Sequence, residues 1–200
     1  MASGIFLSFG HALRGLVEVT ARERNMKIHV LCGTAVGLLG AEVAMPVPSR
    51  LALLLAVALV VAAEMWNSAL EARVDLHTRE LRDEARRVKD AAAGGVLVLA
   101  VGAVLLAVAV GVANQDALRV AMHRRGVQLL LGGGVVLLEA FLLFGRSRSA
   151  LLDGIAIVSG GLLVAFLGVD GLSGSLSLAA ALLFVLASAS AISSRTRIPA

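Results

Sequence analysis

The segment that most constrains how this chain can fold runs from residue 64 to residue 75, Glu-Met-Trp-Asn-Ser-Ala-Leu-Glu-Ala-Arg-Val-Asp. It follows residues 51–63, an apolar run that carries no charge. At about 100° per residue, the four polar side chains of an α-helix here fall on one stripe less than about a quarter-turn wide. They are Glu64, Asn67, Glu71 and Asp75. The pattern predicts a hydrophobic helix with an acidic edge.

An acidic edge on such a helix needs a compensating environment. A carboxylate near the middle of a membrane opposes insertion by about 2.5–3.5 kcal/mol, so it must face protein, a cation or water. Carboxylates one or two turns apart also repel each other, which favours a bound divalent cation or a proton retained on one of them. A buried polar seam between packed helices fits the stripe equally well, so both interpretations stand on this segment alone.

Composition indicates that the whole chain is an integral membrane protein. Its 200 residues are 58% hydrophobic, with a mean hydropathy of +0.91, which excludes a soluble domain of this size. The net charge of +4 does not indicate a nucleic-acid partner, because the charges gather at predicted helix ends, as membrane topology requires. The single cysteine, Cys32, can form neither an internal disulfide nor a metal cluster.

The order of apolar segments predicts an all-α fold in two parts. Residues 4–25 have apolar and polar faces typical of a helix lying on the membrane surface. With three spans at roughly 28–45, 51–72 and 91–112, they form a predicted core over residues 1–113. A linker, 114–126, leads to a membrane extension, 127–200, with three further spans at roughly 127–144, 151–169 and 172–192. Its acids, Glu139, Asp153 and Asp170, are expected at helix ends or interfaces.

The distribution of cations predicts which side each loop occupies. If the N-terminus is cytoplasmic and all six segments cross, fourteen Lys and Arg residues lie inside and four outside. Glu42 is then expected at the outer interface. The small residues 91–95 are expected to let a helix or ligand approach closely. The segment 119–125, which contains three arginines, falls on the outer side, where the preference of Lys and Arg for the cytoplasmic side does not explain it.

In this topology three charged clusters reach the inner face of the membrane. They are Glu23 before the first span, residues 64–75 at the end of the second, and Lys89-Asp90 at the start of the third. Carboxylates and phosphate oxygens suit Mg²⁺, a lysine suits phosphate, and a further carboxylate can accept a proton from an alcohol. These are the parts of a phosphoryl-transfer site. No P-loop or protein-kinase glycine loop is present, so an ATP site must use helix-borne acids and Lys89.

At these clusters the sequence resembles the prokaryotic integral-membrane diacylglycerol kinase / undecaprenol kinase family, over roughly residues 4–113. Four groups of residues match in order and spacing. They are Ser8, Phe9, Ala12, Gly15 and Leu16; Glu23, Arg24, Asn25, Ile28 and His29; Glu64, Met65, Asn67, Ser68, Ala69, Glu71 and Asp75; and Lys89, Asp90, Ala91, Ala92 and Gly94. Val88 replaces the family's usual alanine, and residues 114–200 have no counterpart in the family core.

The resemblance implies a homotrimer of three-span subunits in the bacterial inner membrane, transferring the γ-phosphate of Mg-ATP to a lipid alcohol at the cytoplasmic face. By motif, Glu64 would be the general base, and Glu23 and Glu71 would hold Mg²⁺. Nucleotide and phosphates would be positioned by Asn67, Asp75, Lys89 and Asp90, with Arg14 added from the surface-helix pattern. The Glu-Arg-Asn and Ile-His form of the second group favours undecaprenol over diacylglycerol.

Two other classes of function fit parts of the sequence. A small cation or proton transporter could use the acidic stripe as a path, but a path needs polar groups across the membrane, and residues 51–63 have none. A structural scaffold leaves Glu23 and Lys89-Asp90 unexplained. The extension lacks the motifs of a lipid phosphatase, and no His follows His123, so we expect a non-catalytic addition of three helices.

Overall fold

The computed structural model describes residues 2–77, 83–145, 149–170 and 174–196, and over these residues the chain is entirely helical apart from short connections. The helices are α1 (Ala2–Arg22), α2 (Arg24–Ala41), α3 (Val47–His77), α4 (Asp83–Ala113), α5 (Gln115–Arg124), α6 (Gly126–Phe144), α7 (Ala150–Asp170) and α8 (Gly174–Thr196). Among them, α3, α4, α6, α7 and α8 are long and apolar enough to cross a membrane. The predicted all-α membrane fold is confirmed.

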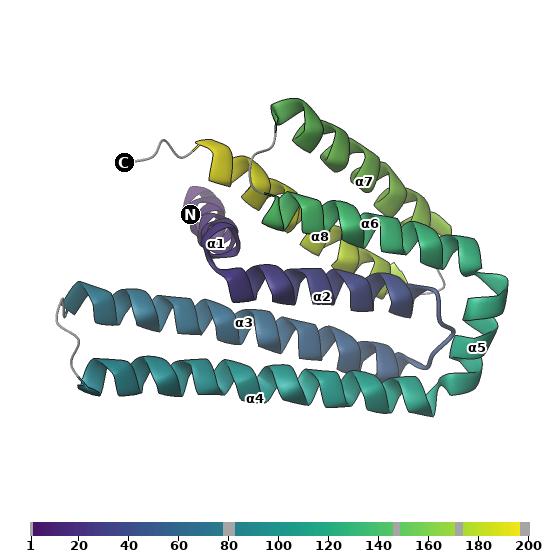
Figure 1. The fold of residues 1–200 in the computed structure, drawn as a ribbon, viewed down its shortest axis with the longest axis horizontal. Coiled ribbons are helices and arrows are strands. Elements are labelled where there is room, and N and C mark those ends of the chain that lie inside the picture. The colour runs from purple at the N-terminus through teal and green to yellow at the C-terminus, as the bar shows by residue number, and fades with distance from the viewer. Residues whose placement is uncertain (1, 78–82, 146–148, 171–173, 197–200) are drawn as a thin grey trace.

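Helices α2, α3 and α4 lie side by side as nearly parallel rods, with α3 in the middle (Figure 1). The 18-residue α2 corresponds to the first expected span, but it is not among the five helices with the length and hydropathy of a membrane span. It packs against α3 on one side and against α6 and α8 on others. Because α2 is too short of apolar residues to count as a span by itself, its position in the bundle is set by packing against these neighbouring helices.

The hairpin of α3 and α4 extends further than the sequence predicted. Helix α3 continues to His77 and α4 begins at Asp83, so both helices run beyond the apolar spans expected at 51–72 and 91–112. The added turns contain Arg73, Glu84, Arg86, Arg87 and Lys89, residue types that favour helix even where they are exposed. The acidic stripe therefore stays on regular helix from Glu64 to Asp75, and this end of the hairpin projects past α1 (Figure 1).

Helix α1 crosses the end of the bundle and is seen nearly end-on beside the start of α2 (Figure 1). Its first half exposes Ile5, Phe6 and Phe9. Its second half packs against α2 and α8, and the Ser190 hydroxyl donates a hydrogen bond to the Val17 carbonyl at 3.3 Å. A helix with free apolar residues that lies across the spans has the geometry of the expected surface helix.

Helices α6 and α8 of the extension pack on α2, and α7 packs on α6 and α8. The core they share includes Leu38 of α2, Val135 of α6 and Phe184 of α8. Close approach needs glycine here: a Cβ at Gly160 would lie 2.3 Å from the Phe184 ring. A Cβ at Gly37 would lie 3.0 Å from both Ala180 Cβ and the Leu176 carbonyl oxygen. The extension is thus joined to α2 by closely fitted small residues.

Buried polar contacts tie the extension together and correct one expectation. Glu139 does not lie at a helix end or interface: its side chain is fully buried, and Thr34 Oγ1 of α2 donates a hydrogen bond to its Oε1 at 3.0 Å. Arg195 Nε donates to Asp153 Oδ2 at 2.5 Å, joining the start of α7 to the end of α8. The side chain of Asp170 lies outside the described part of the structure.

The predicted linker at 114–126 contains the short helix α5, which lies across the ends of α4 and α6 (Figure 1). Glu42, at the end of α2, is only 2% exposed and therefore not interfacial as expected. Arg125 Nη1 donates to Glu42 Oε2 at 2.8 Å. One of the unexplained basic residues of this segment thus neutralises a buried carboxylate.

Candidate functional site

The stripe on α3 changes character along its length. Glu64 and Asn67 are buried, and Glu71 is half-buried. Asn67 Nδ2 donates a hydrogen bond to Glu71 Oε1 at 2.9 Å, one helical turn away. Glu64 Oε2 and Asn67 Oδ1 are buried without a hydrogen-bond partner among the described residues. Because such groups are costly to leave unpaired, they mark a place for a ligand or a proton.

The acid at the α1–α2 junction comes close to the stripe. Glu23 is the N-cap residue of α2, with an extended backbone (φ −86°, ψ 124°) that separates the two helices. Both Glu23 and Glu71 interact unfavourably with the Glu64 carboxylate through space. The junction therefore brings the first cluster to the second, as the sequence predicted, and concentrates negative charge around Glu64.

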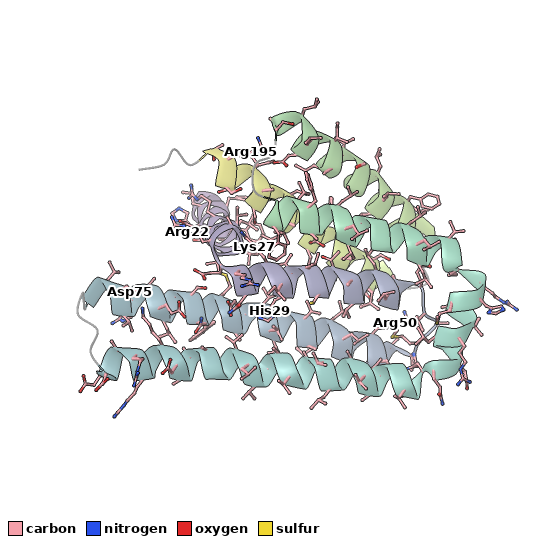
Figure 2. The ribbon with its side chains drawn as sticks, viewed as in Figure 1. Arg22, Lys27, His29, Arg50, Asp75 and Arg195 are labelled. Carbon is pink, nitrogen blue, oxygen red and sulfur yellow. The ribbon has the colours of Figure 1, made fainter. Side chains whose placement is uncertain are left out.

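The third cluster meets the far end of the stripe. Lys89 Nζ of α4 lies 2.5 Å from Asp75 Oδ1 of α3, so an ion pair joins the last turns of α3 to the first turns of α4. Asp75 is exposed and Lys89 half-buried, and Asp75 lies on the projecting end of α3 in Figure 2. Asp90 and Arg14 are both exposed, and the structure shows no contact that brings Arg14 into the cluster.

A groove of about 270 Å³ between α2, α3 and α4 leads toward the acidic cluster. Leu53, Val57 and Val60 line it from α3 and recur at the same three- and four-residue spacing as Glu64, Asn67 and Glu71. One face of α3 is therefore an apolar groove wall over its first half and an acidic edge over its second. The remaining lining is mostly small or apolar, including Gly33, Ala56, Ala100, Ala103 and Ala107.

Two features of this groove were missed by sequence reasoning. His29 lines it as a half-buried side chain, although the sequence analysis used it only as a motif residue. Ala100, Ala103 and Ala107 also line it, and their spacing along α4 was the signal that could have revealed them. Within the chain, no atom of another element lies within 4 Å of a Cβ built at Gly94 or Gly95, so the close approach expected at residues 91–95 stays a prediction for a ligand or another copy.

The acids can serve a metal only together with a ligand. The described residues contain no group of three or more His, Cys, Asp or Glu side chains arranged to hold a metal ion. Mg²⁺ commonly uses one or two carboxylates, with phosphate oxygens and water completing its shell. Glu23 and Glu71, which are both close enough to Glu64 for their charges to act on it, fit that smaller requirement.

Comparison with known proteins decides the family. Residues 10–111 match the family model described as prokaryotic diacylglycerol kinase, and this range contains α2, α3, most of α4 and all three charged clusters. The chain belongs to that family. It is therefore a lipid kinase with a multi-pass membrane fold, and the transporter and scaffold interpretations are set aside.

Two relatives carry different lipid names. The undecaprenol kinase of Bacillus subtilis (strain 168) is 38% identical over 96 residues, which are 48% of this chain and 78% of that protein. The diacylglycerol kinase of Synechocystis sp. (strain ATCC 27184 / PCC 6803 / Kazusa) is 34% identical over 107 residues, 53% of this chain and 61% of that protein. No solved structure matches the chain. The family is thus established, and the lipid is left open between the two.

Proposed function

We propose that this lipid kinase transfers the γ-phosphate of ATP to undecaprenol at the cytoplasmic face of the bacterial inner membrane. The observation that carries the proposal is the face of α3 on which the groove-lining residues end at Val60 and are followed one turn later by the buried Glu64, whose Oε2 has no hydrogen-bond partner among the described residues. A lipid tail in the groove would bring its terminal hydroxyl to the acidic cluster, where the nucleotide phosphates are also held.

In this proposal Glu64 is the general base. The lipid hydroxyl oxygen attacks the γ-phosphorus, the bond from that phosphorus to the β–γ bridging oxygen breaks, and ADP leaves. Glu64 Oε2 accepts the hydroxyl proton. Its burial and the lack of a partner for Oε2 support the assignment, because a base must be free to take a proton from substrate.

The residues around Glu64 would bind the nucleotide. Glu23 and Glu71 would hold Mg²⁺, which neutralises the charge of the phosphates when bound. The bond from Asn67 to Glu71 fixes the orientation of that carboxylate. Lys89 would supply a positive charge to the phosphates, and its ion pair with Asp75 holds the amine at the cluster. Asp90, which follows Lys89 in α4, and Arg14 of α1 are exposed and would contact the nucleotide from the edge of the site.

The shape of the groove supports undecaprenol as the acceptor. A polyprenol presents one hydrocarbon chain to a groove of about 270 Å³, whereas a diacylglycerol presents two, one of which must lie outside it. The motif that includes Ile28 and His29 also favours undecaprenol, and both residues line the groove.

The substrate choice is tested with purified full-length protein, Mg-ATP and either a polyprenol or dioleoylglycerol in the same detergent. We expect a higher kcat/KM for the polyprenol. ATP turnover without added lipid is the control, because it measures hydrolysis that does not depend on the acceptor. A higher kcat/KM for dioleoylglycerol would overturn the choice of lipid and leave the kinase assignment intact.

The proposal retains a homotrimer as the working assembly. Helix α4 supports it, because only 6% of its apolar stretch is buried within one chain, so most of this helix is open to lipid or to another copy. Charge distribution supports the cytoplasmic placement of the site: Asp75 and Lys89 lie at the same end of the bundle as Arg22 and Lys27 (Figure 2).

A further inference from the structure

Helix α5 lies at the end of the bundle opposite the acidic cluster. Figure 2 shows Arg50 at this end and Asp75 at the other. Helix α5 crosses the ends of α4 and α6 at a steep angle to both (Figure 1). It therefore lies along the membrane surface if α4 and α6 cross the membrane. The family match ends at residue 111, so α5 lies outside it.

A cavity of about 600 Å³ lies between α5, the start of α6 and the end of α2. Its charged and polar lining residues are Glu42, Arg124, Arg125 and Gln128. Arg125 Nη1 and Glu42 Oε2 form the 2.8 Å ion pair, which neutralises one guanidinium and fixes the α5–α6 junction against α2. Arg124 adds a second guanidinium to the lining with no second acid to balance it. The cavity therefore has a net positive charge.

The surroundings of the cavity are those of a membrane surface. On α5, Val120 is 53% exposed and Met122 64% exposed, although both are large and apolar. Arg119, by contrast, pairs with Asp116 on the exposed side of the same helix at 3.5 Å and does not line the cavity. An amphipathic helix with free apolar residues and basic residues is suited to the level of lipid headgroups.

We propose that this cavity binds the phosphate group of an anionic membrane lipid, on the face of the membrane opposite the kinase site. A guanidinium is well matched to phosphate because it can donate two parallel hydrogen bonds to it. Arg124 supplies that group, and the Gln128 side-chain amide is placed in the same lining. The exposed apolar residues of α5 keep the cavity beside the acyl chains, so the ligand is a lipid in preference to a soluble phosphate.

Native mass spectrometry of the full-length protein tests the site. The detergent-purified protein is titrated with phosphatidylglycerol or with phosphatidylcholine of the same chain lengths, and bound lipid is counted. We expect wild-type protein to bind phosphatidylglycerol more tightly. Arg124→Gln should weaken that binding about tenfold, as expected for loss of a charge-assisted hydrogen bond. Arg124 is exposed, so the variant should fold.

Arg119→Gln is the matched control, because it removes the same charge from the same helix outside the cavity. It should retain wild-type affinity for phosphatidylglycerol. Equal losses in the two variants would show a general surface charge effect and overturn the proposal, as would wild-type binding in Arg124→Gln. The melting temperatures of the wild type and of Arg124→Gln are also measured with phosphatidylglycerol and with inorganic phosphate. If inorganic phosphate raises the melting temperature of the wild type as much as the lipid does, and does not raise that of Arg124→Gln, the ligand is a soluble anion and the lipid proposal fails.

Discussion

The α3–α4 hairpin and the extension, α6 to α8, are both apolar helices, yet they are packed very differently. Half of the apolar stretch of α8 is buried within the chain, compared with 6% of that of α4. Helix α8 contacts α1, α2, α6 and α7 and, over a smaller area, α3, whereas α4 packs along α3 and touches α5 only near its end. The extension is thus a helical packing unit built around α2, and the hairpin presents its surfaces to lipid, ligand or further subunits.

The polar groups of the two regions differ in the same way. Within the described residues, Asp153 of the extension pairs with Arg195, and at the junction before it Arg125 pairs with Glu42 of the segment after α2. Glu139 receives a hydrogen bond from Thr34 at one oxygen, although its other oxygen stays unpaired. Around Glu64, by contrast, Glu23 and Glu71 act as like charges. This concentration of like charge supports the proposal that the chemistry takes place beside the hairpin and not in the extension.

The largest effect is expected from Glu64→Gln. This change removes the proposed base while keeping the size of the side chain, so kcat should fall about 10²–10⁴-fold. Native mass spectrometry of the same sample should still show three chains per particle. Glu84→Gln, an exposed acid at the start of α4, is the control and should keep full activity. Normal turnover in Glu64→Gln would remove Glu64 from this role, and a different particle mass in the wild type would count against the trimer.

A smaller effect is expected when the groove is filled. Ala103→Phe places a ring in the lining between α3 and α4 and should raise the KM for the lipid about tenfold, since losing about 1.4 kcal/mol of apolar contact corresponds to that factor. The KM for ATP should not change. Ala109→Phe adds the same ring to α4 outside the groove lining and is the control. If both variants have the same KM for lipid, the groove does not hold the acceptor chain.

The smallest effect on catalysis is expected at the contact between α2 and the extension. Thr34→Val keeps the shape of the side chain but removes the only hydrogen bond to the Glu139 side chain among the described residues. Unfolding should become easier by about 0.6–1.7 kcal/mol, seen as a lower melting temperature, because interhelical hydrogen bonds in membranes have that range. We expect kcat to stay within about twofold, as for other conservative changes away from a site.

The control for this contact is Thr20→Val, where the hydroxyl bonds only to the Leu16 carbonyl of its own helix at 2.8 Å. It should shift the melting temperature less than Thr34→Val does. A folded Thr34→Val protein with greatly reduced kcat would contradict the view of the extension as non-catalytic, because the change touches neither Glu64 nor the groove.

The sequence alone determined the helices, the acidic stripe and the family. Helical periodicity is local, so the spacing of Glu64, Asn67 and Glu71 placed them on one face of α3 before any contact was known. The order of the charged clusters along the chain also predicted that they reach the same membrane face, and the structure brings Glu23 near Glu64 and Lys89 to Asp75. The helix bounds were less accurate, because helix-forming residues continue α3 and α4 beyond their apolar spans.

Only the tertiary structure decided which helix faces are covered. Lipid is as apolar as a protein interior, so hydrophobicity alone does not show whether a given face packs on a neighbour or faces the membrane. For that reason the burial of Glu139 against Thr34, the pairing of Glu42 with Arg125 and the groove beside His29 could not be derived from residue type. Each depends on two segments far apart in the chain, and their contact is set by the fit of side chains across helices.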